Sequence, residues 1–163
     1  MTAAVLTVSD SSASGNRPDL SGPAVKSTLE RHKFRVVATQ VIGDEQSAIQ
    51  EAIADLASRA QLVVTTGGTG IAERDVTPEA TRAVCSRLVE GVAERMRAIG
   101  SQSTSLAALS RGVCGICGRA LVLNLPGSPQ AATESLRAVL DILPHALDLL
   151  EGRTAHSADL NRS

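Results

Sequence analysis

The residues with the clearest chemical potential lie between positions 65 and 79. Here the run Thr65-Thr66-Gly67-Gly68-Thr69-Gly70 follows three apolar residues, 62–64. Glycine lets backbone N–H groups approach an anion closely, and threonine hydroxyls add further donors. Thr77 as a helix N-cap and Pro78 at the first helical position predict a helix whose positive end points back at the loop. The pattern predicts an anion-binding site, whereas Gly-Gly alone would indicate only a flexible connection.

Two acids are candidates for metal or phosphate chemistry. Asp75 lies between the glycine-rich run and the predicted helix, where it would bind magnesium or place charge beside bound phosphates. The alternative is that it only interacts with the dipole of that helix. Asp44 follows an earlier predicted strand and would supply a second carboxylate to the same ion, or cap the helix that begins near Glu45. The spacing alone leaves both alternatives open.

Further polar side chains follow the first predicted strand and the central region. Ser9 and Asp10 are placed to contact a phosphate or a pterin-like group, although a solvated loop explains them equally well. Arg74 and Arg111 are candidate phosphate clamps, or simply solvated surface arginines. Cys114 and Cys117 form a single CxxC pair, which without a second pair is weak evidence for zinc, so packing is the favoured interpretation.

The elements that must position these residues alternate between strands and helices. Residues 3–9, 35–42 and 62–66 have the apolar, β-branched composition of buried strands, and residues 22–32 and 46–59 have helical periodicity. This β-α-β-α-β order predicts an α/β fold with a mostly parallel sheet covered by helices on both faces. Because parallel strands place ligands outside their carboxyl ends, the loops at 9–15, 43–44 and 67–75 are expected to line one cleft.

The second half of the chain completes one predicted domain. Helices are expected at 79–86 and 91–99, followed by a late β-hairpin with arms at 113–116 and 120–124. Ser128, with Pro129 behind it, is a predicted N-cap for a helix at about 130–140, and residues 143–150 form a last helix. The expected organisation is a single domain over residues 1–152 with a polar tail at 153–163.

Composition excludes several classes of function. The formal net charge of the 163 residues is −1, which gives no electrostatic basis for binding nucleic acid or a membrane surface. One Phe and no Tyr or Trp leave no aromatic platform for base stacking. The N-terminus has no basic segment of a signal peptide, and no apolar run approaches the roughly 20 residues of a membrane span. These features, with three cysteines, predict a cytoplasmic protein without a disulfide framework.

Several motifs together resemble one family. The run 65–70 with Arg74-Asp75-Val76-Thr77-Pro78-Glu79 closely resembles the molybdopterin adenylyltransferases of molybdenum cofactor synthesis, to which the G domain of gephyrin is related. Residues 6–11 (LTVSDS), 109–111 (LSR) and 124–128 (NLPGS) resemble three further motifs of that family. The likeness extends from about residue 5 to residue 151.

This resemblance implies a three-layer α/β domain that transfers AMP from ATP to the terminal phosphate of molybdopterin and releases pyrophosphate. The family's important acids fall on Asp44 and Asp75, which would hold Mg2+. The resemblance also implies a homotrimer, or a hexamer as in a related branch, and a hand-over of product to a molybdenum-inserting protein. The alternative is a homologue that binds molybdopterin without adenylylating it. The residues expected at the substrates are Ser9, Asp10, Thr66, Gly67, Gly68, Thr69, Gly70, Thr77, Pro78, Ser110, Arg111, Asn124, Pro126, Gly127 and Ser128.

Overall fold

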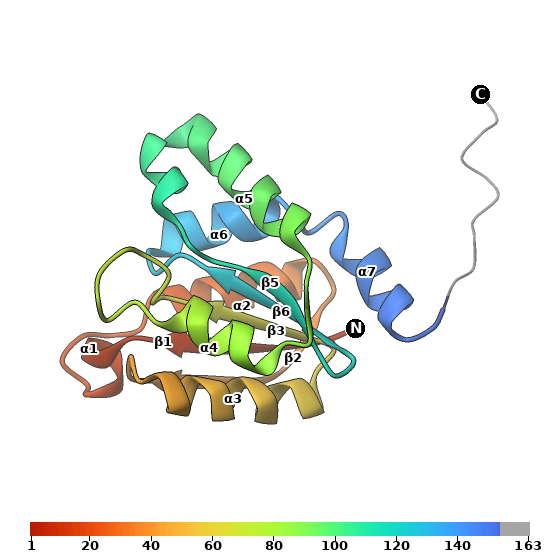
Figure 1. Cartoon of the computed structure of the whole chain (residues 1–163), viewed down its shortest axis with the longest axis horizontal. Coiled ribbons are helices and arrows are strands. Elements are labelled where there is room, and N and C mark those ends of the chain that lie inside the picture. The colour runs from red at the N-terminus through yellow and green to blue at the C-terminus, as the bar shows by residue number, and fades with distance from the viewer. Residues whose placement is uncertain (154–163) are drawn as a thin grey trace.

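A twisted sheet with helices packed on both faces forms three layers (Figure 1). The computed structural model describes residues 1–153; the expected tail beyond Arg153 lies outside the described residues. The strands of the sheet are β1 (Thr2–Val8), β2 (Arg35–Ile42), β3 (Leu62–Thr66), β4 (Arg87–Leu88), β5 (Cys114–Cys117) and β6 (Ala120–Leu125).

The sheet is mostly parallel, as predicted. Its strand order is β2-β1-β3-β6-β5-β4, and neighbouring strands among the first four run parallel. The predicted hairpin is formed by β5 and β6, which pair antiparallel from Cys114 opposite Leu123 to Cys117 opposite Ala120. Gly118 in its turn has a φ of 59°, a conformation that glycine adopts without strain. The short edge strand β4, antiparallel to β5, was not expected from the sequence.

Helices cover both faces of this sheet. They are α1 (Asp10–Ala13), α2 (Ser21–Arg31), α3 (Gln46–Arg59), α4 (Thr77–Val84), α5 (Glu90–Ser103), the 3-10 helix η1 (Ser105–Leu109), α6 (Pro129–Arg137) and α7 (Leu143–Leu150).

Two apolar cores hold the layers together. On one face, Leu29 of α2, Met96 of α5 and Leu136 of α6 pack in the same cluster as the inward residues of the sheet. On the other face, where α3 and α4 lie (Figure 1), Ile53 packs with Leu6 and Val122. Aliphatic residues build both cores, since the chain offers only one Phe.

Some predicted helix boundaries were wrong, and one was confirmed. Thr77 is not an N-cap but the first residue of α4, because its hydroxyl donates to the Gly67 carbonyl instead. The helix after β2 is capped by Glu45, whose carboxylate accepts from the N–H groups of Ser47 and Ala48, so Asp44 is free of that role. α5 continues through Gly100 to Ser103, beyond the expected end at residue 99. Ser128 is the predicted N-cap of α6 and accepts from Ala131 N.

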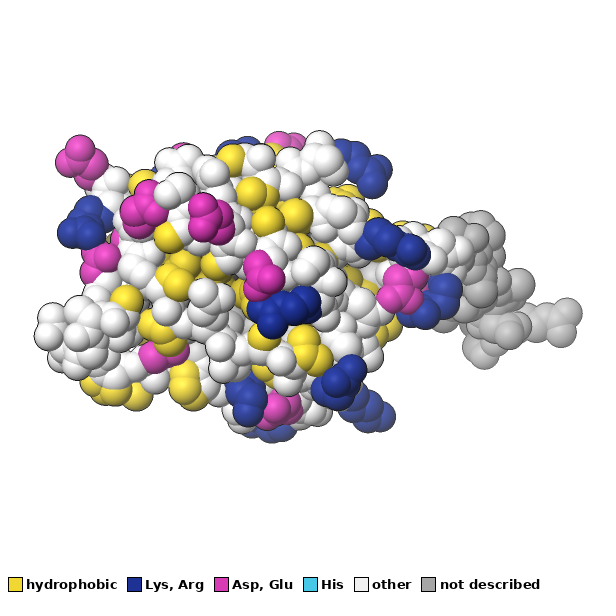
Figure 2. Space-filling view, turned by 90° about the horizontal axis from the view of Figure 1, so that it is seen from below, with side chains coloured by type: hydrophobic (Ala, Val, Ile, Leu, Met, Phe, Trp, Pro, Cys, Tyr) yellow, Lys and Arg dark blue, Asp and Glu magenta, His cyan; other side chains and the backbone are white. Residues whose placement is uncertain are grey.

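The surface carries charges of both signs. On the face shown in Figure 2, acidic and basic side chains are interspersed, in keeping with the net charge of −1. Within residues 1–153, none of the helices combines the length and the apolar character that crossing a membrane requires.

The buried central strand β6 gives a first test of the packing. Leu123 is fully buried there, so Leu123→Ala is expected to lower the free energy of unfolding by about 2–5 kcal/mol, through lost transfer energy and a residual cavity. The matched control is Leu149→Ala on α7, where the leucine is 49% exposed. Urea unfolding of both variants measures the difference; equal losses would contradict the assignment of β6 to the core.

Candidate active site

The carboxyl ends of β1, β2, β3 and β6 meet at one edge of the sheet, which brings four loops together. The loops after β1 and β2 are joined by a reciprocal pair of hydrogen bonds. Asp44 N donates to Asp10 Oδ1 and Asp10 N donates to Asp44 Oδ2, each at 2.9 Å. Arg74, from the glycine-rich loop after β3, forms an ion pair with Asp10. Asp10 therefore links three of the four loops.

Asp44 and Asp75 carry negative charge that the protein does not neutralise. Burial, and then the nearby charge of Asp75, raise the pKa of the Asp44 carboxyl. Among residues 1–153 neither carboxylate takes part in an ion pair, since Arg74 binds Asp10 and Arg111 binds Glu79. Two like charges held close together favour either a proton or a cation between them. The pair is thus suited to a divalent cation that a ligand brings with it.

The glycine-rich loop has a conformation that requires glycine. Gly67 and Gly68 have φ angles of 101° and 64°, in the region that residues with side chains avoid. The turn is fixed by Thr77, whose hydroxyl donates to Gly67 O at 3.0 Å and whose N–H donates to Gly68 O at 3.1 Å. A Cβ on Gly68 would lie 3.2 Å from Asp44 Oδ1, so glycine lets this carboxylate lie against the backbone.

Asp75 is held by the other arm of the same loop. Its Oδ2 accepts from Ala72 N at 2.9 Å, and its own N–H donates to Ala72 O at 2.9 Å. These bonds define a tight turn just before α4. The carboxylate is therefore positioned by backbone groups, and its charge remains available to a ligand.

Two cavities meet at Asp75, and Asp44 lines one of them. Cavity A, of about 470 Å³, lies between the glycine-rich loop, α5, η1 and the start of α6. Cavity B, of about 310 Å³, lies between the same loop and the segments after β1 and before α2. Gly68, Asp75 and Gly127 line both. A group bound in one cavity would thus adjoin a group bound in the other at Asp75.

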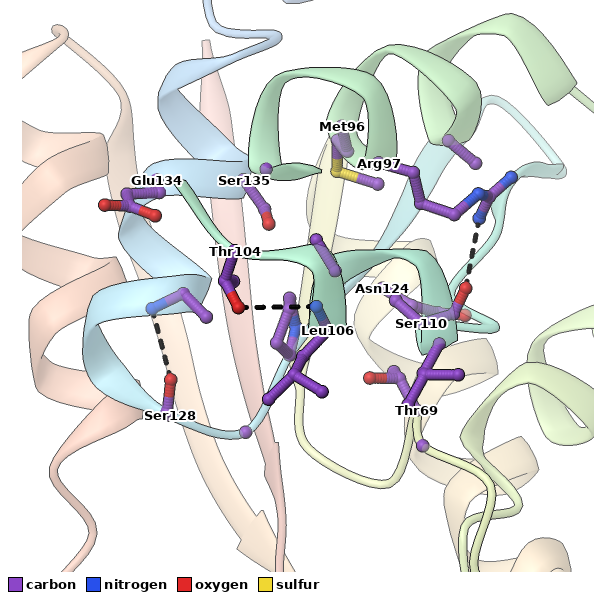
Figure 3. Close-up of a pocket in the computed structure, with 18 of the residues that line it drawn as sticks. Thr69, Met96, Arg97, Thr104, Leu106, Ser110, Asn124, Ser128, Glu134 and Ser135 are labelled. Carbon is purple, nitrogen blue, oxygen red and sulfur yellow. Dashed lines mark hydrogen bonds between the residues drawn. The ribbon is translucent and has the colours of Figure 1, made fainter. Parts of the chain in front are cut away.

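The two cavities differ in chemistry. In cavity A (Figure 3), Met96 and Leu106 supply apolar surface, while Arg97 is the only Lys or Arg among its lining residues. Cavity B is lined by hydroxyls of Ser9, Ser11, Ser12 and Ser21. Cavity A suits an organic group with apolar and polar parts, and cavity B suits a strongly hydrogen-bonding ligand.

Asn124 connects the floor of cavity A to the helix behind it. Its amide donates to Thr65 Oγ1 at 3.0 Å and to Thr81 Oγ1 at 2.9 Å, and its oxygen accepts from Val113 N at 3.2 Å. Because Asn124 is 1% exposed, these bonds satisfy polar groups that would otherwise be buried without partners. The residue therefore fixes the relative position of β3, β6 and α4.

The structure gathers most of the predicted site residues around the two cavities. Those that line cavity A are Gly68, Thr69, Gly70, Asp75, Ser110, Asn124, Pro126, Gly127 and Ser128. Those that line cavity B are Ser9, Asp44, Thr66, Gly67, Gly68, Asp75 and Gly127. Four line neither cavity: Asp10, Thr77, Pro78 and Arg111.

Other lining residues were not predicted. Arg97 and Ser135 reach cavity A from α5 and α6, and no local motif marks either (Figure 3). Asp19 lines cavity B, where it accepts from Thr7 Oγ1 at 2.7 Å and from Gly22 N at 3.0 Å. The order Asp19, Ser21, Gly22, Pro23 is a helix-start signal that could have indicated it.

The acids fit a magnesium ion that shares its ligands with phosphate. In residues 1–153 no group of three or more His, Cys, Asp or Glu side chains is arranged to hold a metal. Mg2+ commonly takes only one or two carboxylates and completes its shell with water and phosphate oxygens. Asp44 and Asp75 match that requirement, because their mutual repulsion is relieved by a cation.

The cysteines do not have the character of metal ligands or redox groups. Burial raises the pKa of Cys114 to about 12 and that of Cys85 to about 11, so both thiols remain protonated at neutral pH. All three cysteines are free, and Cys114 packs in the core beside Leu123. These observations favour packing.

The comparisons with known proteins define the family. Residues 4–145 match the family described as "Probable molybdopterin binding domain", and the chain belongs to this family. It is 38% identical to the molybdopterin adenylyltransferase of Helicobacter pylori strain J99 over 152 residues, which are 91% of this chain and 86% of that protein. It is 37% identical to the molybdopterin adenylyltransferase of Escherichia coli K12 over 170 residues, 94% of this chain and 87% of that protein.

Solved structures agree with this assignment. The molybdopterin biosynthesis enzyme MoaB of Thermus thermophilus has a TM-score of 0.87 at 48% identity, over 93% of this chain and 96% of that one. A structure of MogA has a TM-score of 0.87 at 38% identity, over 92% and 99%. The fold observed here is therefore that of MoaB and MogA.

The glycine-rich loop gives a test with a matched control. A Cβ on Gly67 would lie 2.2 Å from Val8 O, whereas one on Gly118, also at positive φ, would meet no atom within 4 Å. Gly118→Ala is expected to cost about 1–2 kcal/mol from backbone strain alone. Gly67→Ala should cost about 1–3 kcal/mol more, since the backbone must shift to remove the overlap. Equal losses in urea unfolding would contradict the observed loop conformation.

Proposed function

We propose that this protein is a molybdopterin adenylyltransferase of molybdenum cofactor biosynthesis, which transfers AMP from ATP to the terminal phosphate of molybdopterin. One observation carries the proposal. Asp75 lies where a cavity with apolar surface meets a hydroxyl-lined one, Asp44 lines the second cavity beside it, and neither acid has an ion-pair partner among residues 1–153. A reaction between two phosphate-bearing molecules needs such a junction.

The names of the relatives indicate which reaction to expect, and the arrangement of the site is suited to that reaction. The H. pylori and E. coli relatives are both named molybdopterin adenylyltransferase. In such a transfer a phosphate oxygen of molybdopterin attacks the α-phosphorus of ATP, and pyrophosphate leaves. No protein nucleophile is required, so positioning and charge stabilisation account for catalysis.

In this proposal, the residues around the junction bind and orient the two phosphate groups. Backbone N–H groups of Gly68, Thr69 and Gly70 in the loop, and of Gln130 in the first turn of α6, are the proposed donors for phosphate oxygens. Thr77 keeps the loop in its bent conformation through its bonds to Gly67 and Gly68. Asn124 holds the strand ends beneath the loop at fixed separation.

Asp44 and Asp75 are the proposed magnesium ligands. When bound, Mg2+ supplies electrostatic stabilisation of the charge that develops on the phosphate oxygens. Asp10 keeps Asp44 oriented by their reciprocal backbone bonds, and Ala72 keeps Asp75 oriented. The proposal extends to a cytoplasmic homotrimer, or a hexamer, and to hand-over of the product to a molybdenum-inserting protein, as the family resemblance implies.

A second candidate function is molybdopterin binding without adenylyl transfer. MoaB of T. thermophilus, which is 48% identical, is described as a molybdopterin biosynthesis enzyme, and this description does not name adenylyl transfer. The two candidates differ in one measurable respect, because only the first requires ATP to react.

The acid Asp75 provides the decisive variant. Purified protein is incubated with ATP, Mg2+ and freshly released molybdopterin, and adenylylated molybdopterin is measured by mass spectrometry. Asp75→Asn keeps the shape and removes the charge, so turnover is expected to fall by about 100-fold or more. Its melting temperature should not fall, because Asp44 loses a repulsive neighbour.

The matched control is Glu73→Gln, which removes an exposed acid from the same loop and should leave turnover unchanged. Full activity in Asp75→Asn would contradict the role given to that acid. Wild-type protein that binds molybdopterin but forms no product would support the second candidate instead.

A further inference from the structure

Arg111 lies behind the glycine-rich loop and contacts both of its arms. Its Nε donates to Gly70 O at 2.7 Å, and its Nη2 donates to Asp75 O at 2.5 Å. Its backbone N–H donates to Thr69 O at 2.9 Å. One residue therefore binds the loop before and after its exposed tip at 71–74, and one of its bonds is to the backbone of the acid itself.

The guanidinium is in turn oriented by Glu79. This glutamate, in the first turn of α4, forms an ion pair with Arg111. The hydrogen bond from Arg111 also holds the pKa of Glu79 below its usual value, so the pair is charged at neutral pH. A planar guanidinium can serve several acceptors at fixed angles, which an ammonium group cannot do.

The segment that carries Arg111 is itself anchored. Arg97 of α5 donates from Nη1 to Gly112 O at 2.9 Å. Asn124 N donates to Val113 O at 3.0 Å, and Val113 N donates back to the Asn124 side chain at 3.2 Å. These hydrogen bonds attach the segment of Arg111 to β6 and α5. They restrain the position from which Arg111 binds the loop.

Arg111 lines neither cavity A nor cavity B. It lines a third hollow, between α4, α5 and β5, together with Glu79 and Arg82. A residue that held a substrate phosphate would be expected on the surface of cavity A or B, where Asp75 is found. The location on the opposite side of the loop favours a supporting role.

We infer that Arg111, oriented by Glu79, is a positioning residue that fixes the backbone of Asp75, and not a phosphate clamp. The role presupposes the adenylyl transfer proposed above. Small displacements of a catalytic group lower the rate of the chemical step strongly, by about 100-fold for about 1 Å. Substrate affinity need not change, because the donors facing the two cavities stay in place.

The test compares Arg111→Lys, which keeps the charge and loses the fork, with Arg82→Lys one turn from Glu79 on α4. Arg82 is exposed, and within residues 1–153 it makes no hydrogen bond to the loop.

For Arg111→Lys, kcat should fall by about 10- to 100-fold while KM for ATP stays within about threefold. In the ligand-free protein, amide hydrogen exchange in residues 68–77 should accelerate, with β1 and β6 unchanged. Arg82→Lys should match wild type in all three measurements.

Glu79→Gln provides a milder second variant, because the amide oxygen still accepts a hydrogen bond. It should shift kcat and loop exchange in the same direction by a smaller factor. An increase in KM for ATP or molybdopterin with unchanged kcat and unchanged loop exchange would overturn the inference and make Arg111 a substrate contact. Unchanged loop exchange in Arg111→Lys would overturn it as well. If the wild-type protein proves inactive, the proposed function fails, and the exchange measurement still decides whether Arg111 holds the loop.

Discussion

The placement of Asp44 and Asp75 in one cavity, without an ion-pair partner among residues 1–153, is the constraint on which the proposed site depends. Folding brings the ends of β2 and β3 to one edge of the sheet, where Asp44 and Asp75 line the same cavity and burial, then the charge of Asp75, raise the pKa of Asp44. The nearby arginines do not neutralise the charge of Asp44 or Asp75, since Arg74 forms an ion pair with Asp10 and Arg111 forms one with Glu79. The protein thus maintains a negative centre that a cation with phosphate ligands can neutralise.

The surrounding residues hold this centre in place through the backbone. The backbone N–H groups of Asp10 and Asp44 each donate to the carboxylate of the other residue, Ala72 N–H donates to the Asp75 carboxylate, and Thr77 fixes the turn at Gly67. Backbone groups can approach this closely because the loop contains glycines at positive φ. Arg111 adds a support from the rear of the loop. The acids are therefore held in place while neither forms an ion pair among residues 1–153, an arrangement that suits the electrostatic role proposed for them.

Local sequence patterns predicted the fold, and together with the family resemblance they indicated most of the residues that the structure gathers around the two cavities. Strand and helix periodicity indicated the parallel sheet, and the rule that ligands lie at strand ends placed the loops with Asp44 and Asp75 together. The sequence could not indicate the cavity residues that come from elements distant in the chain. Arg97 and Ser135 reach cavity A from helices whose orientation depends on tertiary packing. The function of Thr77 was also hidden, because a hydroxyl that could cap a helix instead binds Gly67 across the turn.

The binding of a non-hydrolysable ATP analogue, with and without Mg2+, tests the central claim most directly. Isothermal titration calorimetry of the wild type should show a Kd that Mg2+ lowers by about tenfold or more, because the two carboxylates repel phosphate until a cation lies between them. In Asp44→Asn with Asp75→Asn, the analogue should bind without Mg2+ more tightly than it does to wild type, and Mg2+ should add little. A wild-type Kd independent of Mg2+, or a double variant that still requires it, would contradict the account.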